Sequence, residues 1–150
     1  MSPTSAFIDT NLLILLLVGS SDRNQVGKHR RTRNFSSEDY DRLVFLIDSL
    51  DRVLVTPNIL TETSNLLNNS HDFRLMEQLR LLINQTDEVY IKSKSVANSQ
   101  IFTRLGLTDS VLLESVSIKS PLITVDFDLY GAAVSKGDGY AFNFTHWQAW

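Results

Sequence analysis

Four acidic residues of this 150-residue chain follow predicted strands or belong to the helices that come after them. Asp9 ends the apolar segment 5–9, and Asp126 directly follows the apolar segment 121–125. Glu62 lies inside the helix that leaves another predicted strand, and Asp109 opens a further helix. Carboxylates gathered in one cleft repel each other, and oxygen ligands of this kind suit Mg²⁺ or Mn²⁺. The pattern therefore predicts a divalent metal site.

Each of these acids also has an ordinary structural interpretation. An aspartate at the start of a helix often caps its N-terminus, which would account for Asp9 or Asp126 taken singly. Asp109 would interact favourably with the dipole of its helix from the first turn. Glu62 could be a solvated helix residue that happens to lie near an apolar face. The metal site is predicted only because all four acids are expected to meet at one edge of a sheet.

Predicted strands alternate with predicted helices or helix pairs along the whole chain. Strands are predicted at 5–9, 52–56, 89–91, 121–125 and, as an edge strand, 140–144. Helices are predicted over 12–18, from 36 or 37 to 50, from 57 to about 67, from about 72 to 83, over 95–105, from 108 to 116 with Thr108 as its cap, and around 132–133. This alternation predicts one α/β domain over residues 1–150: three α/β/α layers around a mostly parallel sheet of four or five strands.

Composition narrows the class of protein. The net charge of −3 argues against a generally basic nucleic-acid binder, although it permits a local basic patch. The chain has no cysteine, which excludes disulfides, thiol catalysis and cysteine-bound zinc. The apolar run 12–18 is shorter than the roughly 20 residues that span a bilayer. It also lacks the positive charges that precede the core of a signal peptide. We interpret it as a buried helix, and expect a cytoplasmic protein without membrane association.

Four short segments resemble motifs of the PIN-domain ribonuclease family. They are Phe-Ile-Asp9-Thr-Asn11, Thr-Glu62-Thr-Ser-Asn65-Leu-Leu, Gly-Leu-Thr-Asp109-Ser and Ile-Thr124-Val-Asp126-Phe-Asp128-Leu. The segments occur in the order of the family, and together they extend over nearly the whole chain. Each motif alone is weakly specific, whereas the four together are specific.

The resemblance implies a metal-dependent endoribonuclease that hydrolyses RNA phosphodiester bonds. Its catalytic residues and its ligands for Mg²⁺ or Mn²⁺ would be Asp9, Glu62, Asp109 and Asp126. Asp128 would be a fifth acid at the metal, with Asn11 and Thr124 as supporting hydrogen-bonding residues. Many members of the family are VapC-type toxins that an antitoxin neutralises. By resemblance, we expect a toxin with an antitoxin partner and a homodimeric assembly.

Other classes of protein remain as alternatives. A catalytically silent PIN-like scaffold would bind RNA or a protein partner without cutting, although the four intact acids argue against it. The pair Asp126 and Asp128 is similar to the paired acids of toprim or phosphatase-type sites, which have different companions at the first strand. A Rossmann domain would need a glycine-rich turn after the first strand, and the segment 9–13 contains no glycine.

Two polar or aromatic segments lie outside these motifs. The segment 19–34 is predicted to be an exposed, mobile loop that contains Lys28, Arg30, Arg31 and Arg33. One interpretation is that these cations contact RNA. The other is that the loop is merely solvated, as is usual for a run of charged residues. The tail 146–150 carries Trp147 and Trp150, which could stack on bases. We favour the simpler interpretation that this tail packs on the domain or on a partner subunit.

Overall fold

The computed structural model describes residues 3–68 and 72–146. Within them, five parallel strands form one sheet in the order β3-β2-β1-β4-β5. The strands are β1 (Ser5–Ile8), β2 (Arg52–Val55), β3 (Asp87–Glu88), β4 (Leu122–Thr124) and β5 (Ala141–Asn143). The predicted α/β class and the mostly parallel sheet are confirmed, and the last strand lies at an edge as predicted.

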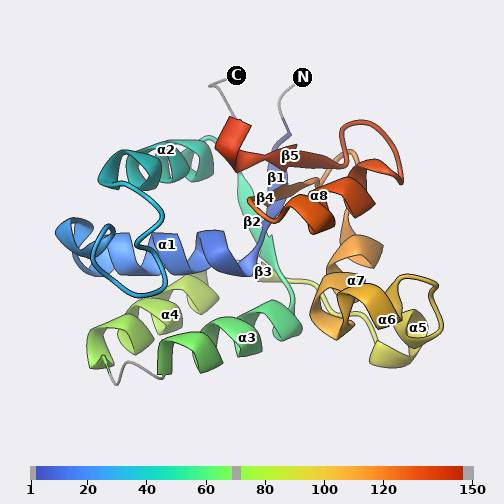
Figure 1. Cartoon of the computed structure of the whole chain (residues 1–150), viewed down its shortest axis with the longest axis horizontal. Coiled ribbons are helices and arrows are strands. Elements are labelled where there is room, and N and C mark those ends of the chain that lie inside the picture. The colour runs from blue at the N-terminus through green and yellow to red at the C-terminus, as the bar shows by residue number, and fades with distance from the viewer. Residues whose placement is uncertain (1–2, 69–71, 147–150) are drawn as a thin grey trace.

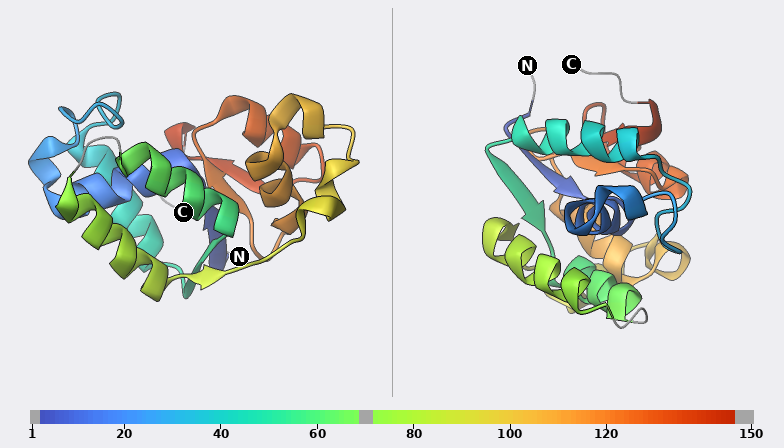
Figure 2. Two further views of the ribbon diagram at one scale, coloured as in Figure 1. Left: turned by 90° about the horizontal axis from the view of Figure 1, so that it is seen from below. Right: turned by 90° about the vertical axis from the view of Figure 1, so that its left-hand side faces the viewer.

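Helices cover both faces of this sheet. They are α1 (Thr10–Ser21), α2 (Ser37–Asp48), α3 (Pro57–Asn68), α4 (Phe73–Gln85), α5 (Ser93–Ala97), α6 (Phe102–Leu105), α7 (Leu107–Ser115) and α8 (Phe127–Val134), with 3₁₀ turns η1 (Arg23–Gln25) and η2 (Phe144–His146). Helices α1–α4 lie on one side of the sheet and α5–α8 on the other (Figures 1 and 2). Among the described residues, no helix is both long and apolar enough to cross a bilayer.

Helix α1 is the central element of the core. Its apolar run is buried almost all round, as the sequence predicts, because the helix lies between the sheet and helices α2, α3 and α4. Seen end-on in Figure 2, it lies between α2 on one side and α3 and α4 on the other. Gly19 permits a close approach to α2, since a Cβ atom there would lie 2.2 Å from Cδ2 of Tyr40.

Three predicted elements differ from the structure. The strand expected at 89–91 is β3 at Asp87–Glu88, because backbone pairing with Leu54 and Val55 defines it, whereas the prediction followed apolar side chains. The helix expected at 95–105 is divided into α5 and α6 by turns at 98–101, where Asn and Ser side chains compete for backbone hydrogen bonds.

The cap predicted at Thr108 is also wrong. Helix α7 begins at Leu107, and Gly106, two residues before Thr108, takes the N-cap position with a φ of +84°. This left-handed conformation is readily available only to glycine. Thr108 therefore lies in the first turn of the helix, next to Asp109.

The segment 19–34 makes buried and ionic contacts with the rest of the domain, which a purely solvated loop would not make. Its first three residues belong to α1, and the side chains of Val26 and Thr32 are fully buried. The Thr32 hydroxyl donates a hydrogen bond to the carbonyl oxygen of Val26 at 2.6 Å. Arg23 forms a two-pronged ion pair with Asp41 of α2, with N···O distances of 3.0 and 2.7 Å.

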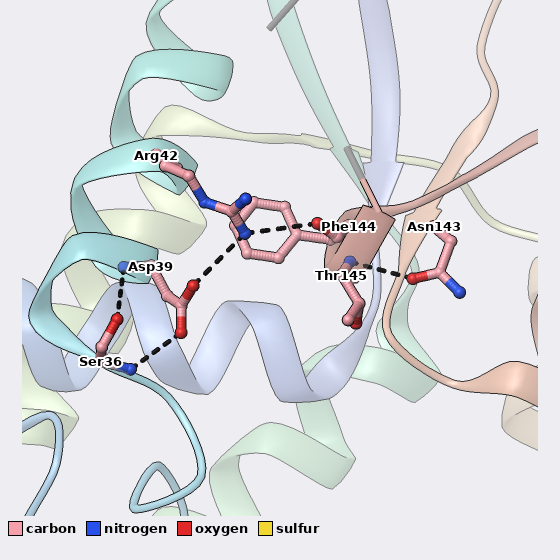
Figure 3. Close-up of polar contacts among 6 residues, drawn as sticks. All are labelled: Ser36, Asp39, Arg42, Asn143, Phe144 and Thr145. Carbon is pink, nitrogen blue, oxygen red and sulfur yellow. Dashed lines mark hydrogen bonds and ion pairs between the residues drawn. The ribbon is translucent and has the colours of Figure 1, made fainter. Parts of the chain in front are cut away.

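The end of the described chain is fixed to helix α2 (Figure 3). The Arg42 guanidinium lies 4.7 Å from the centroid of the buried Phe144 ring, and its Nη2 donates to the Phe144 carbonyl oxygen at 3.4 Å. Asp39 orients Arg42 at 3.3 Å and completes a capping box with Ser36. The predicted packing of the tail concerns residues 147–150, which lie outside the described residues.

Candidate functional site

The sheet has a topological switch point between β1 and β4. From β1 the chain moves to β2 on one side, and from β4 it moves to β5 on the other side. In open parallel sheets, ligands bind beyond the carboxyl ends of the strands at such a point. Asp9 follows β1 and Asp126 is the second residue after β4, so two predicted site residues lie at this position.

Asp9 is both a helix cap and a residue of the candidate site. Its Oδ1 accepts a hydrogen bond from the Leu12 N–H at 3.0 Å, which caps α1. Its Oδ2 accepts from the Val125 N–H at 3.1 Å and from the Thr124 hydroxyl. The side chain is buried, and burial raises its pKa, while these three hydrogen bonds act in the opposite direction. The capping and site interpretations of Asp9 are therefore compatible.

Thr124 links the two strand ends. Its hydroxyl donates to Asp9 and accepts a hydrogen bond from the Asp126 N–H at 2.9 Å. Asp126 in turn caps α8, because its Oδ1 accepts from the Leu129 N–H at 3.0 Å. Thr124 thus holds one acid directly and the backbone of the other.

Glu62 and Asp109 reach the same place from helices α3 and α7. A cleft of about 320 Å³ is lined by all four acids and by Asn11, and its remaining walls are Thr10, Leu105, Gly106, Leu107, Thr108 and Leu129. Burial raises the pKa of Asp109 to about 6, and the negative charges of Asp126, Glu62 and Asp9 add to this shift. The four acids predicted to converge therefore do so closely enough to affect one another's charge.

No basic side chain compensates this charge in the described part of the chain. The ion pairs there join Arg23 to Asp41, Arg42 to Asp39, Arg52 to Asp87, Arg74 to Asp72 and Arg80 to Glu77. None of them involves a cleft acid. Carboxylates in a cleft with no cationic partner are a donor set that fits a hard divalent cation such as Mg²⁺ or Mn²⁺.

Among the described residues, no three acidic or histidine side chains stand ready to hold a single metal ion. Mg²⁺ usually keeps several of its waters and binds through one or two carboxylates together with substrate phosphates. The donor set of the cleft is in keeping with that mode of binding. The proposal of a metal depends on the convergence of the acids and on their uncompensated charge.

Other predicted residues lie away from the cleft. Asp128 is exposed in the first turn of α8 and is not among the residues that line the cleft. The basic segment that contains Lys28, Arg30, Arg31 and Arg33 follows the C-terminal end of α1, whereas Asp9 stands at its N-terminal end. Figure 1 shows this loop at the end of α1 remote from the sheet. Helix α1, whose twelve residues span about 18 Å, lies between Asp9 and the start of this segment.

Several residues of the cleft were not predicted. Leu105, Gly106 and Leu107 form the wall where α6 meets α7, and the Val125 N–H holds Asp9. The sequence contained a signal for the wall, since Gly106-Leu-Thr precedes Asp109 within one of the motifs. It contained none for Val125, because a backbone N–H is available at almost every position.

The comparisons with known proteins do not assign this site. No protein-family model matches the chain, and a search of curated proteins found no match either. The chemistry of the cleft is therefore inferred from its own residues and from the motif resemblance.

Proposed function

We propose that this chain is a Mg²⁺- or Mn²⁺-dependent endoribonuclease of the PIN-domain type, with Asp9, Glu62, Asp109 and Asp126 as its metal ligands. The observation that carries the proposal is the convergence of these four carboxylates, from four different segments, in one cleft without a basic partner. A phosphodiester is itself anionic, so carboxylates alone would repel it. A bound divalent ion reverses the local charge and activates water for attack on phosphorus.

The residues of the chain prepare this site in distinct ways. Three hydrogen bonds hold the Asp9 carboxylate in one orientation, so little reorganisation is needed when it binds a cation. The Leu129 N–H donates a hydrogen bond to Oδ1 of Asp126, and the Asp126 side chain is exposed to solvent. Asp109 and Glu62 contribute charge from the facing helices. No role is assigned to Asp128.

By the same resemblance, we propose a toxin with an antitoxin partner, a homodimeric assembly and a cytoplasmic location. These parts of the proposal depend on the motifs alone. The alternative is a PIN-like scaffold that binds RNA or a protein and does not cut, and the experiment below decides between them.

The test compares cleavage of a labelled single-stranded RNA by the wild type and by Asp109→Asn, over a range of Mg²⁺ and Mn²⁺ concentrations and in EDTA. We expect metal-dependent cleavage by the wild type and a loss of at least about 10²-fold in the variant. Calorimetry should show weaker Mn²⁺ binding by Asp109→Asn. Glu114→Gln, on the exposed side of the same helix, is the matched control and should behave as wild type.

Asp109→Asn is preferable to Asp9→Asn in this test. An amide at position 9 would place an NH₂ group against the Thr124 hydroxyl or a backbone N–H, so the fold itself would be disturbed. Preparing Asp109→Asn in parallel also controls for contaminating nucleases. Equal cleavage by both proteins, or wild-type cleavage that persists in EDTA, would contradict the proposal. Mn²⁺ binding without any cleavage would favour the silent scaffold.

A further inference from the structure

A second cavity adjoins the acid cleft. It has a volume of about 450 Å³, is more open than the cleft, and is lined by Pro57, Asn58, Thr61, Glu62, Asn65, Leu66, Leu107 and Thr108. Three of these residues, Glu62, Leu107 and Thr108, also line the acid cleft. A molecule whose reacting group lies among the acids would therefore extend directly into this second cavity, which we call the α3–α7 groove.

One stripe of helix α3 carries both the acid and the polar groups of the groove. Residues 61 and 62 follow residue 58 by three and four positions, and residue 65 follows them by four and three, which places all four side chains on one face of a helix. Asn58 and Asn65 thus flank Glu62 on the same face. In the described part of the chain, neither of their side-chain amides has a hydrogen-bond partner. Their donors and acceptors are available to a ligand.

Apart from Thr108, the remaining lining is apolar. Pro57 and Leu66 are half-buried in the groove, and Leu107, which is 37% exposed, stands at the boundary with the cleft. The residues that line the groove, as far as the structure describes them, include no Lys or Arg. Such a surface offers no cation to pair with a phosphate, and Glu62 would repel one. It suits a flat, neutral group with apolar faces and a polar edge.

We propose that the α3–α7 groove binds a nucleobase of single-stranded RNA, next to the phosphodiester held at the acid cleft. This inference rests on the proposed nuclease function and names its substrate class. A base in a duplex has its faces stacked and its edge paired, whereas a base in a single strand can turn outward into a recess. The amides of Asn58 and Asn65 each present a donor and an acceptor, as base recognition requires. The groove would set the base preference of cleavage.

The first experiment is independent of any cleavage. The full chain without metal is titrated with adenosine, cytidine, guanosine and uridine, and with ribose as a blank, while the side-chain amide signals of Asn58 and Asn65 are followed by NMR. Free nucleosides contain no phosphodiester and need no metal ion. We expect at least one nucleoside to shift both signals at millimolar concentration, and ribose to shift neither.

The second experiment reads the base preference of cleavage. The wild type, Asn65→Ala and Asn58→Ala/Asn65→Ala cleave a pool of random single-stranded RNA in Mn²⁺, and the ends produced are sequenced. We expect a preference at one position beside the cut in the wild type. Each variant should lose about tenfold in kcat/KM on the preferred base and little on the others. Asn68→Ala, exposed on the same helix and outside both cavities, is the matched control.

The outcomes separate this proposal from the proposed function. One outcome is that cleavage depends on metal, that wild type and variants share the same base preference, and that no nucleoside shifts the amide signals. This outcome would overturn the base site and would still support the proposed nuclease function. Nucleoside-induced shifts in a protein that cuts no RNA would support the base site and remove the nuclease. If nucleosides leave both amide signals unchanged and a protein partner shifts them, the groove is a protein interface and the proposal is wrong.

Discussion

The two ends of helix α1 carry opposite charges, and different forces build them. At its N-terminal end, Asp9 is held by hydrogen bonds and meets three further acids in a cleft. At its C-terminal end, the basic segment is attached by the packing of Gly19 against Tyr40 and of the buried Val26 and Thr32 side chains. An ion pair of Arg23 with Asp41 adds to this attachment.

A titratable side chain at each end reports how the charges are arranged. At the acid end, burial and like charges raise the pKa of Asp109. At the basic end, burial lowers the pKa of His29, and the charges of Arg31 and Arg30 act in the same direction while Asp72 opposes them. His29 also accepts a hydrogen bond from the Arg31 N–H at its Nδ1, 3.1 Å away, so its neutral form fits the loop.

The difference is the reason that we propose a cation for the acid end and not for the basic end. Lys28, Arg30 and Arg33 are exposed at the surface, where water and salt screen their repulsion. The cleft acids include a buried Asp9 and a half-buried Asp109, for which screening is weaker. A divalent cation is the simplest way to neutralise the acid end. The exposed cations of the basic end could hold a polyanion at the surface.

The largest effect on stability should come from breaking the packing at the basic end. In Gly19→Ala, the new Cβ would lie 2.2 and 2.5 Å from Cδ2 and Cε2 of Tyr40, so the Tyr40 ring or helix α2 must shift. We expect a loss of about 1–3 kcal/mol in the free energy of unfolding, measured with urea. Mn²⁺ binding at the other end should persist.

Gly131→Ala is the matched control for this prediction. Gly131 lies in helix α8, and a Cβ atom there would meet no neighbouring atom within 4 Å. Alanine has the higher helix propensity, so this variant should be as stable as the wild type or more stable. If Gly19→Ala proved equally harmless, the close contact between α1 and α2 would not be what secures the basic end.

A smaller change of opposite sign is expected at the acid end. In the metal-free cleft, the charged Asp109 side chain is partly buried and is repelled by the neighbouring acids. Asp109→Asn removes both costs, so it should raise the free energy of unfolding at pH 7. The pKa of Asp109 rises from 3.8 to about 6, and after a discount for its partial exposure we expect about 1–2 kcal/mol. Added Mg²⁺ should stabilise the wild type more than the variant.

The pH dependence of this gain follows from the direction of the shift. Because the folded-state pKa of Asp109 is raised, the folded wild type binds more protons than the unfolded chain between about pH 4 and pH 6. The stability that this proton contributes is therefore present at low pH and is lost as the pH rises through 6. The two proteins should differ most above pH 6.5 and least near pH 4, which urea unfolding in EDTA at several pH values measures.

The smallest effect concerns RNA contacts at the basic end. The triple variant changes Arg30, Arg31 and Arg33 to Gln. If each arginine contacts one phosphate, the slope of log binding constant against log salt concentration should become less steep by about 2, because each contact with a single strand contributes roughly 0.7. KM should rise while kcat stays unchanged, since none of these loop residues lines the acid cleft. Binding is measured in the Asp109→Asn background and rates in the active protein.

A matched triple variant separates local contacts from net charge. Changing the exposed Arg52, Arg80 and Lys119 to Gln removes the same charge elsewhere and should leave the salt slope nearly unaltered. An unchanged slope in the loop variant would mean that the loop is merely solvated or contacts a protein partner.

The sequence by itself determined the order of strands and helices, the burial of α1 and the placement of acids at strand ends. These features are encoded within a few neighbouring residues, by apolar periodicity and by capping side chains such as Asp9, Ser36 and Asp126. Where local signals conflict they were less reliable, as in the strand found at Asp87–Glu88 and the turns that divide segment 95–105.

Only the tertiary structure decided how closely the predicted acids meet and which charged residues lie outside the cleft. Glu62 and Asp109 lie far from Asp9 in the chain, and their mutual repulsion exists because α3 and α7 both pack beside the switch point. It also placed Asp128 outside the cleft and the basic loop at the remote end of α1. Electrostatic coupling depends on distance and burial in space. Those quantities are fixed by how separate segments pack together, and no short stretch of sequence contains them.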